Sequence, residues 1–153
     1  MAKVEETIEV NVPVSTAYNQ WTQFEDFPQF MSGVKSVKQV DDTHLRWRAD
    51  VAGQEQEWDA EITEQTPDQR VAWTSTSGSR NAGVVNFHYI ADGKTKIQVM
   101  MDVEPPAGVA GQAVDSVFGL TSKSVKGDLE RFKTFIEARG RETGAWRGEV
   151  SRN

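Results

Sequence analysis

Three tryptophans are the residues of this chain whose type and spacing best suit the binding of a ring-containing molecule. Trp47, Trp58 and Trp73 each occupy the apolar phase of a segment that alternates like a β-strand, so we expect all three on the inner face of one sheet. A large ring with one N–H suits both a packed core and a pocket wall, and the sequence leaves both interpretations open. Five further residues are expected to line the same space: Phe87, Tyr89, Met101, Phe118 and Leu129.

Catalysis by proton transfer next to a carbonyl would need a buried acid or base and a donor for the enolate oxygen. Tyr89 is the best-placed donor on the inner face, Ser75 could orient a carbonyl, and Arg80 lies in a polar segment expected to rim the opening. No Asp or Glu falls in the inner phase of a central strand, and His88 alternates outward. We therefore assign no catalytic residue and keep Tyr89, Ser75 and Arg80 only as candidates.

The sequence offers little that could bind a metal ion or a cofactor. It contains no cysteine and only two histidines, His44 and His88, which are far apart in the chain. Zinc sites need three or four Cys, His or carboxylate ligands, and the HExxH, Walker, GxSxG and dinucleotide-binding motifs are all missing. We expect no metal and no cofactor.

Composition limits the class of protein and of partner. The 153 residues suffice for one domain. Acidic residues outnumber basic ones by 23 to 17, a net charge of −6, which disfavours nucleic acid or an anionic membrane as the main partner. No apolar run approaches the ~20 residues of a membrane span, so no stable membrane insertion is expected. The first residues do not resemble a signal peptide, and we expect a cytoplasmic protein.

The elements that must position these side chains follow a distinctive order. Residues 3–12 alternate as a strand up to Pro13, and two short helical pieces follow, the second interrupted by Pro28. Six more strand-like segments come next, joined by turns too short for a helical crossover, which indicates antiparallel hairpins. These strands carry residues 34–41, 44–52, 55–64, 70–76, 84–90 and 97–103, with a polar loop at 77–83.

The rest of the chain predicts one long helix and a polar tail. Residues 112–139 contain no proline and repeat apolar residues every three or four positions, as in an amphipathic helix, and Gly140 suits its C-cap. Such a helix is the one long element able to cover the inner face of the sheet. We predict an α+β helix-grip fold, a seven-stranded curved antiparallel sheet around the C-terminal helix, with a cavity between them. The domain spans residues 1–140, and residues 141–153 form a flexible tail.

A hairpin between two of these strands predicts a register. A tight turn at Gly53 and Gln54 would place Trp47 opposite Ala60 and Ala49 opposite Trp58. On the outer face, the same register brings basic side chains of 44–52 beside the acidic side chains of 55–64. The acidic run is then most simply a solvated strand face.

The chain resembles the polyketide cyclase/dehydrase branch of the START-like superfamily, which is related in fold to the birch-pollen allergens and to coenzyme-Q-binding proteins. The resemblance runs from about Val4 to about Ile136 and is carried by EVNVPVSTAYNQWTQFEDFPQFM, GQEQEWDAEITEQTPDQRVAWTSTSG, NAGVVNF and the Pro105-Pro106 strand end. It implies the helix-grip fold. Members of this group are variously thought to bind lipids, steroids, quinones or polyketides, and only some catalyse a reaction, so the fold does not choose among these functions.

Three functions are compatible with the sequence. The first is binding or transport of a small hydrophobic or aromatic molecule in the cavity, by a monomer or homodimer. The second is an aromatase/cyclase or dehydratase that acts on a polyketide-like chain in the same cavity. The third is an interaction module whose cavity has collapsed onto its tryptophans and whose acidic sheet face is the working surface. A polar lining with a buried ionisable group would favour the enzyme, and a dry apolar pocket would favour binding.

Overall fold

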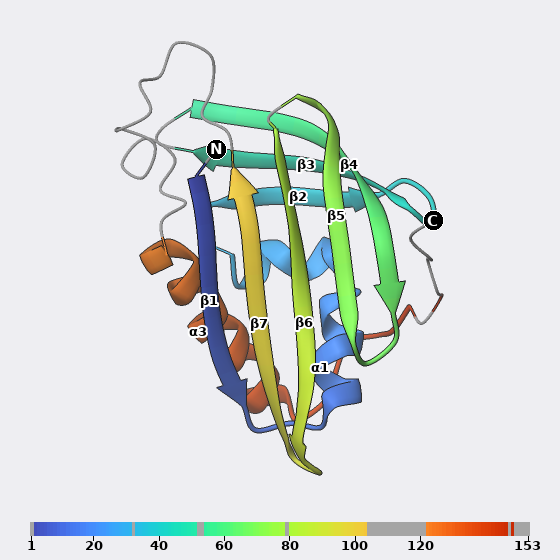
Figure 1. Ribbon diagram of the computed structural model, residues 1–153, viewed down its shortest axis with the longest axis vertical. Helices are drawn as coiled ribbons and strands as arrows, with labels where there is room; N and C mark the ends of the chain where they lie inside the picture. The colour runs from blue at the N-terminus through green and yellow to red at the C-terminus, as the bar shows by residue number, and fades with distance from the viewer. Residues whose placement is uncertain are drawn as a thin grey trace.

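A computed structural model of the chain describes residues 2–31, 33–51, 54–78, 80–103, 122–146 and 148. A single antiparallel sheet of seven strands, in the order β1-β7-β6-β5-β4-β3-β2, forms most of the molecule (Figure 1). The elements are β1 (Ala2–Val10), α1 (Val14–Trp21), the 3₁₀ helix η1 (Phe24–Gln29), β2 (Val34–Gln39), β3 (His44–Val51), β4 (Gln54–Thr66), β5 (Arg70–Gly78), β6 (Asn81–Ala91), β7 (Lys94–Val103) and α3 (Ser122–Arg139).

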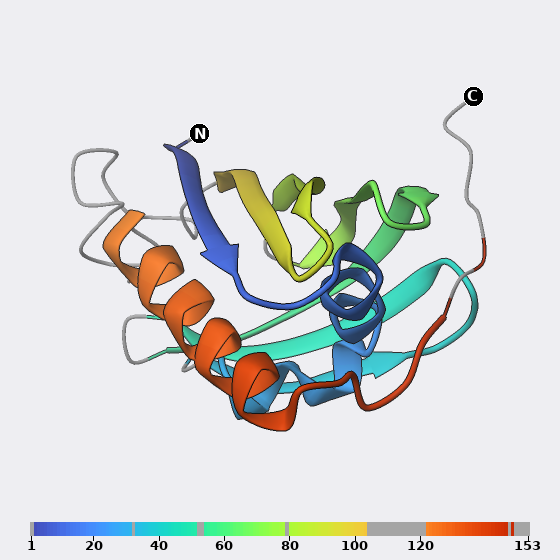
Figure 2. The same cartoon turned by 90° about the horizontal axis from the view of Figure 1, so that it is seen from below.

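The arrangement of these elements confirms the helix-grip prediction. Strands β2 to β7 form a meander of hairpins, and β1 pairs with β7 at the far edge. The sheet curls so that α1 and α3 lie on its concave side, with α3 along the open side beside β1 (Figure 2). No helix among the described residues combines the length and the apolar character that crossing a membrane requires.

The C-terminal helix is anchored by apolar residues that recur every three or four positions. Val125, Leu129, Phe132 and Ile136 are all buried, as expected for one apolar face of an amphipathic helix. The helix ends at Arg139, where Gly140 adopts a φ of +74° and its N–H donates to the Ile136 carbonyl at 2.9 Å, so the predicted C-cap is confirmed. The predicted first turns of this helix, from residue 112, lie outside the described residues.

Aromatic rings fill the core between the helices and the sheet. The Trp21 ring of α1 lies 5.1 Å from that of Phe132 in α3, 5.5 Å from that of Phe27 in η1 and 6.2 Å from that of Phe87 in β6, between ring centroids. Phe30 meets Phe132 edge-on at 5.1 Å. Rings in tilted and edge-on contact of this kind add to the stability that their buried area provides. The cluster therefore fixes both helices against the sheet.

The hairpin of β3 and β4 has a register two residues away from the predicted one. Val51 pairs with Gln54, so Trp47 lies opposite Trp58, and Ala49 opposite Gln56. The prediction was wrong because it centred the turn one residue too late. A shift of two residues leaves every side chain on its predicted face, so the inner and outer faces are as expected.

Residues 141–146, part of the segment predicted to be a flexible tail, lie against α1 and β4. The Thr143 N–H donates to Gln20 Oε1 at 2.9 Å, the Trp146 N–H donates to Thr22 Oγ1 at 2.9 Å, and Gln65 Nε2 donates to the Trp146 carbonyl at 3.0 Å. Gln20 and Gln65 are both fully buried. Buried amides need hydrogen-bond partners. This segment supplies one to Gln20 Oε1 and one to Gln65 Nε2, which is the physical reason why it differs from the predicted loose tail.

Candidate ligand-binding face

The three tryptophans singled out by the sequence share one region of the concave face. Trp47 on β3 lies directly opposite Trp58 on β4, and Trp73 on β5 lies between Ile62 on β4 and Gly83 on β6. All three rings are half-buried and pack against the core. They are therefore less completely buried than Phe87 and Leu129, which face the same side of the sheet.

Trp47 and Trp58 form a parallel stack. Their ring centroids are 5.6 Å apart and their planes differ by 10°, and Trp47 also contacts Phe27 at 5.6 Å. The stack follows from the register, since directly opposed side chains of two antiparallel strands lie close enough to touch. The two indole Nε1 atoms are buried, and neither finds a hydrogen-bond acceptor among the described residues.

Trp73 is held differently from this pair. Its Nε1 donates to Asn81 Oδ1 at 3.0 Å, and the Asn81 backbone N–H donates in turn to Ser75 Oγ at 3.0 Å. The ring lies over Gly83, where a Cβ atom would come within 2.7 Å of two ring carbons. Ser75, a catalytic candidate from the sequence, thus has a structural role as the acceptor that orients Asn81.

The other residues expected to line the cavity divide into two groups. Phe87 and Leu129 are closed into the core, at 4% and 2% exposed, and Phe87 packs edge-on against Tyr18 at 5.5 Å between centroids. Met101 is half-buried and lies opposite Gly83, in the same row of the sheet as Trp73. Phe118 lies outside the described residues.

Tyr89 does not lie within the covered part of the concave face, contrary to our expectation. It keeps the inner phase opposite Thr95, but its side chain is 63% exposed and its hydroxyl donates to Asp92 Oδ1. This hydrogen bond raises the pKa of the tyrosine above its ordinary value. The cause is the length of the β6–β7 hairpin, whose tip projects past the helices that cover the rest of the face (Figure 1).

Arg80 is also exposed, in the short turn between β5 and β6. The polar loop predicted at 77–83 is shorter than expected, because β5 continues to Gly78 and β6 begins at Asn81. Gly78 makes this possible: its φ is +77°, and a Cβ there would lie 2.2 Å from the Glu57 carbonyl oxygen. The turn therefore closes tightly against β4, and Arg80 lies at its surface.

One inner-phase carboxylate was missed by the sequence analysis. Glu6 on the edge strand β1 lies opposite Val99 of β7, and its side chain is half-buried. Its alternation with Val4 and Ile8 is the signal that could have found it. The prediction that central strands carry no inward Asp or Glu is unaffected, because β1 is an edge strand.

The outer face of the β3–β4 hairpin is electrostatically self-compensated. Arg46 contacts Asp59 at 3.0 Å, and Arg48 contacts both Glu55 and Glu57. A hydrogen bond from Arg48 lowers the pKa of Glu55, and hydrogen bonds from Ser77 and then Arg46 lower the pKa of Asp59. With the acidic side chains of β4 paired to the basic ones of β3, this face is a poor acidic docking surface, which disfavours the interaction-module hypothesis.

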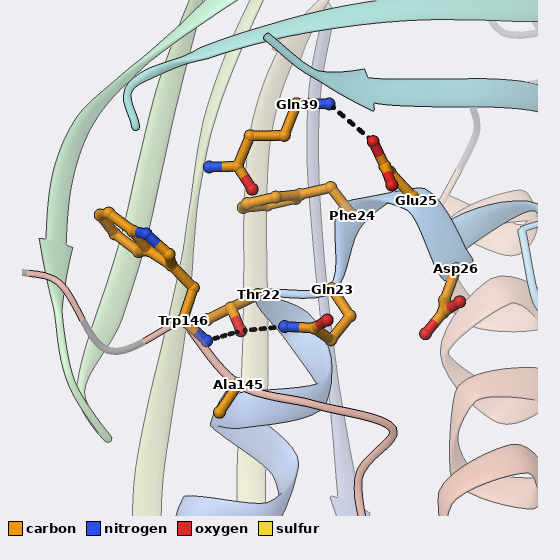
Figure 3. Close-up of a pocket in the computed structure, with 8 residues that line it drawn as sticks. All are labelled: Thr22, Gln23, Phe24, Glu25, Asp26, Gln39, Ala145 and Trp146. Atoms are coloured by element: carbon orange, nitrogen blue, oxygen red, sulfur yellow. Dashed lines mark hydrogen bonds between the residues drawn. The ribbon is translucent and has the colours of Figure 1, made fainter. Parts of the chain in front are cut away.

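A separate hollow of about 300 Å³ lies beside the C-terminal segment (Figure 3). The Phe24 ring and the Trp146 indole flank it, and the Gln39 side chain lies next to the Phe24 ring. Its polar groups already bond one another: the Gln39 backbone N–H donates to Glu25 Oε2 at 3.2 Å, and Trp146 is bonded to Thr22. This hollow is not the expected cavity between sheet and α3. Among the described residues, no three His, Asp or Glu side chains are grouped so that they could hold a metal ion.

Comparison with known proteins places the chain in a family. A family model described as "Polyketide cyclase / dehydrase and lipid transport" matches residues 10–133. The chain belongs to this family, which confirms the resemblance found in the sequence.

Individual relatives extend the comparison. An "uncharacterized 17.2 kDa protein in melC2-rnhH intergenic region" of Streptomyces lincolnensis is 56% identical over 151 residues, which is 98% of this chain and 99% of that protein. A START superfamily protein from Mycobacterium smegmatis superposes with a TM-score of 0.70 at 20% identity, over 90% of this chain and 95% of its own. The Zhui aromatase/cyclase from Streptomyces sp. R1128 has a TM-score of 0.73 at 15% identity, over 95% and 99% of the two chains. At such identities the two structures establish a common fold only.

Proposed function

We propose that this protein binds a small hydrophobic, ring-containing molecule between the concave face of its sheet and α3. The observation that carries the proposal is a contrast in burial along one face. Near α1 the inner side chains are closed into the core, whereas Trp47, Trp58, Trp73 and Met101 face inward but are only half-buried. Uncovered aromatic surface on a concave face is characteristic of ligand sites.

Membership of a family described by both cyclisation and lipid transport supports binding of an apolar molecule. The ligand class is a lipid, a quinone or a polyketide-like molecule. Binding is favoured over catalysis because two of the three catalytic candidates are already engaged: Ser75 accepts the Asn81 N–H, and the Tyr89 hydroxyl bonds Asp92 at the surface. We further propose that the protein acts in the cytoplasm, as a monomer or a homodimer.

Tryptophan fluorescence provides a direct test, because three of the five tryptophans lie in the proposed site. Titration with flavonoids, quinones and fatty acids is expected to quench the emission of the wild-type protein saturably. The variant W73F removes one indole of the site and should bind more weakly. The matched control W146F alters a tryptophan within the C-terminal segment, outside the proposed site, and should bind as the wild type does.

Native mass spectrometry of the protein purified from its own host complements the titration. A co-purifying small molecule that is lost on denaturation is the expected result. Protein that is free of any such molecule, and whose fluorescence does not respond to any of the three ligand classes, would contradict the proposal.

A further inference from the structure

Two buried hydrogen-bond donors on the binding face have no acceptor in the described protein. They are the indole N–H groups of Trp47 and Trp58, whose rings stack 5.6 Å apart on neighbouring strands. A buried donor without a partner costs about 1–3 kcal/mol of stability, and nearly all such groups in native proteins are paired. Two of them in contact on one face indicate that something outside the described chain completes the pair.

The neighbouring tryptophan, Trp73, shows that a protein group on this face can accept the hydrogen bond of an indole N–H. Trp73 donates its N–H to Asn81 Oδ1, and Asn81 is held in turn by Ser75. Trp47 and Trp58 have no such partner among the described residues. Their inner-face neighbours include Val37, Ala49 and Ala60, which have no polar side-chain atom. The half-buried Gln56 also lies beside Trp58 on this face, but it accepts a hydrogen bond from neither indole N–H. Of the three tryptophans of this face, Trp73 is therefore satisfied, and the stacked pair keeps unmet N–H donors among the described residues.

The charge of the surrounding face narrows the chemistry of the missing acceptor. No Lys or Arg occupies an inner-phase position of the seven strands as far as the structure describes them, and the one charged residue there is Glu6 on β1. A carboxylate ligand would be buried beside aromatic rings without a cation, which is costly. A neutral oxygen acceptor avoids this cost and still accepts an N–H hydrogen bond.

We propose that Trp47 and Trp58 recognise a neutral carbonyl or ether oxygen on the ring system of the bound molecule. The proposal rests on the proposed function and deepens it, because it selects oxygen-bearing neutral rings over hydrocarbon chains and free fatty acids. The stacked rings supply apolar contact area, and their N–H groups supply the preference for an oxygen.

Two probes of matched shape test this preference. Fluorenone carries a carbonyl oxygen that fluorene lacks, and the measured quantity is the ratio of the fluorene Kd to the fluorenone Kd, by calorimetry. Substitution of both tryptophans by phenylalanine, W47F/W58F, keeps two aromatic rings and removes both N–H donors. We expect this ratio to fall about threefold to tenfold in the double variant. W73F, whose N–H is already bonded within the protein, should weaken both probes alike, and W146F should change neither Kd.

A negatively charged probe tests the neutrality of the acceptor. Fluorene-9-carboxylate is expected to bind the wild-type protein at least tenfold more weakly than fluorenone. Equal or tighter binding of the carboxylate would overturn the claim that the site selects a neutral oxygen.

Nuclear magnetic resonance of the wild-type protein gives a readout that does not depend on the folding of any variant. The indole N–H signals of Trp47 and Trp58, assigned from the single variants W47F and W58F, should move downfield with fluorenone and not with fluorene. If both probes bind with an unchanged Kd ratio in the double variant and the signals do not move, the acceptor inference fails while the proposed function stands. If neither probe binds the wild-type protein, the proposed function fails for ring-shaped ligands, and the inference fails with it.

Discussion

At the scale of single residues, the placement of the Trp73 ring depends on the glycine across the strand from it. The six-membered part of the indole occupies the space where a side chain at position 83 would begin, 2.7 Å from the ideal Cβ position. The same Cβ would also lie 2.9 Å from the Met100 carbonyl oxygen, which belongs to the backbone and cannot rotate away. Gly83 therefore determines how closely Trp73 approaches the sheet.

The variant G83A tests this dependence. Because the added methyl group must displace either the indole or the β7 backbone, we expect the free energy of unfolding to fall by about 1–3 kcal/mol. Chemical denaturation measures the loss. The matched control is G93A in the β6–β7 turn, where an added Cβ meets nothing within 4 Å, and where the change should stay within about 0.5 kcal/mol. Equal effects of the two variants would contradict the proposed role of Gly83.

A second residue-scale feature is the pair of His44 and Asp41 on the outer face. The His44 Nδ1 lies 2.8 Å from Asp41 Oδ1, and this contact raises the pKa of His44 above 6.5. Hydrogen bonds from the Thr43 backbone and from His44 lower the pKa of Asp41 below 3.8. The raised histidine pKa stabilises the fold below pH 6.5 and loses its effect as pH rises through the folded-state pKa. The lowered aspartate pKa stabilises the fold above pH 3.8 and loses its effect as the pH falls through its own folded-state value.

The variant D41N tests the pair. Removal of the carboxylate charge should lower the pKa of His44 toward 6.5, as measured by proton NMR titration of its ring signal. The chain has one other histidine, His88. The ring signal that is missing from the spectrum of the variant H88Q belongs to His88, so the remaining signal belongs to His44. A His44 titration that is unchanged in D41N would show that the contact does not raise its pKa.

Sequence patterns predicted the direction of these side chains better than their burial. Alternation placed Trp47, Trp58 and Trp73 on the inner face correctly, because the side-chain period of a strand is two. Alternation also placed Tyr89 on this face, but the side chain is exposed there and not covered as expected. Phase says which side of the sheet a residue points to, whereas burial depends on how far the covering helices extend.

At the scale of elements, the C-terminal segment is part of the structure although its composition suggested a loose tail. Its hydrogen bonds go to residues that are distant in sequence, such as Gln20, Thr22 and Gln65. Local composition carries no sign of such partners. The register of β3 and β4 was predicted wrongly for a related reason. A shift of two residues keeps every side chain on the same face, so the alternation pattern cannot distinguish the two registers, and only the geometry of the turn does.

Truncation measures what the segment contributes. A chain that ends at Gly140 leaves the buried amides of Gln20 and Gln65 without the partners that they have in the intact protein. We expect its free energy of unfolding to be about 2–4 kcal/mol lower, measured by denaturation in urea. A chain that ends at Gly148 keeps all of these hydrogen bonds and is the matched control. Equal stability of the two truncated chains would mean that the segment only rests on the surface.

At the scale of the whole molecule, one cluster of rings joins elements that are far apart in the chain. Trp21, Phe27, Phe30 and Phe132 connect α1, η1, the residue that follows η1, and α3, and contacts to Phe87 and Trp47 continue the cluster into the sheet. Helix and sheet therefore share a core instead of having one each. The sequence predicted this shared core correctly. The sheet has one apolar face and one solvent-exposed face, and the apolar face of a single amphipathic helix is what can cover it.

A shared core predicts that helix and sheet unfold together, and Phe132 is the residue on which to test it. Its ring is fully buried and contacts both Trp21 and Phe30 at 5.1 Å between centroids, so F132A should lower the free energy of unfolding by about 3–5 kcal/mol. The half-buried Phe135, one turn along on α3 and in contact with Phe30 at 5.4 Å, is the control, and F135A should cost clearly less.

Circular dichroism distinguishes a shared core from two separate ones. The far-ultraviolet signal reports the backbone of helix and sheet, and the near-ultraviolet signal reports the packing of the rings. Both transitions should move to lower urea by the same amount in F132A and keep a common midpoint, because a two-state domain loses both together. If the near-ultraviolet signal of F132A is lost first while the far-ultraviolet signal remains, the ring packing is lost separately from the backbone structure, and the ring cluster does not unify the fold.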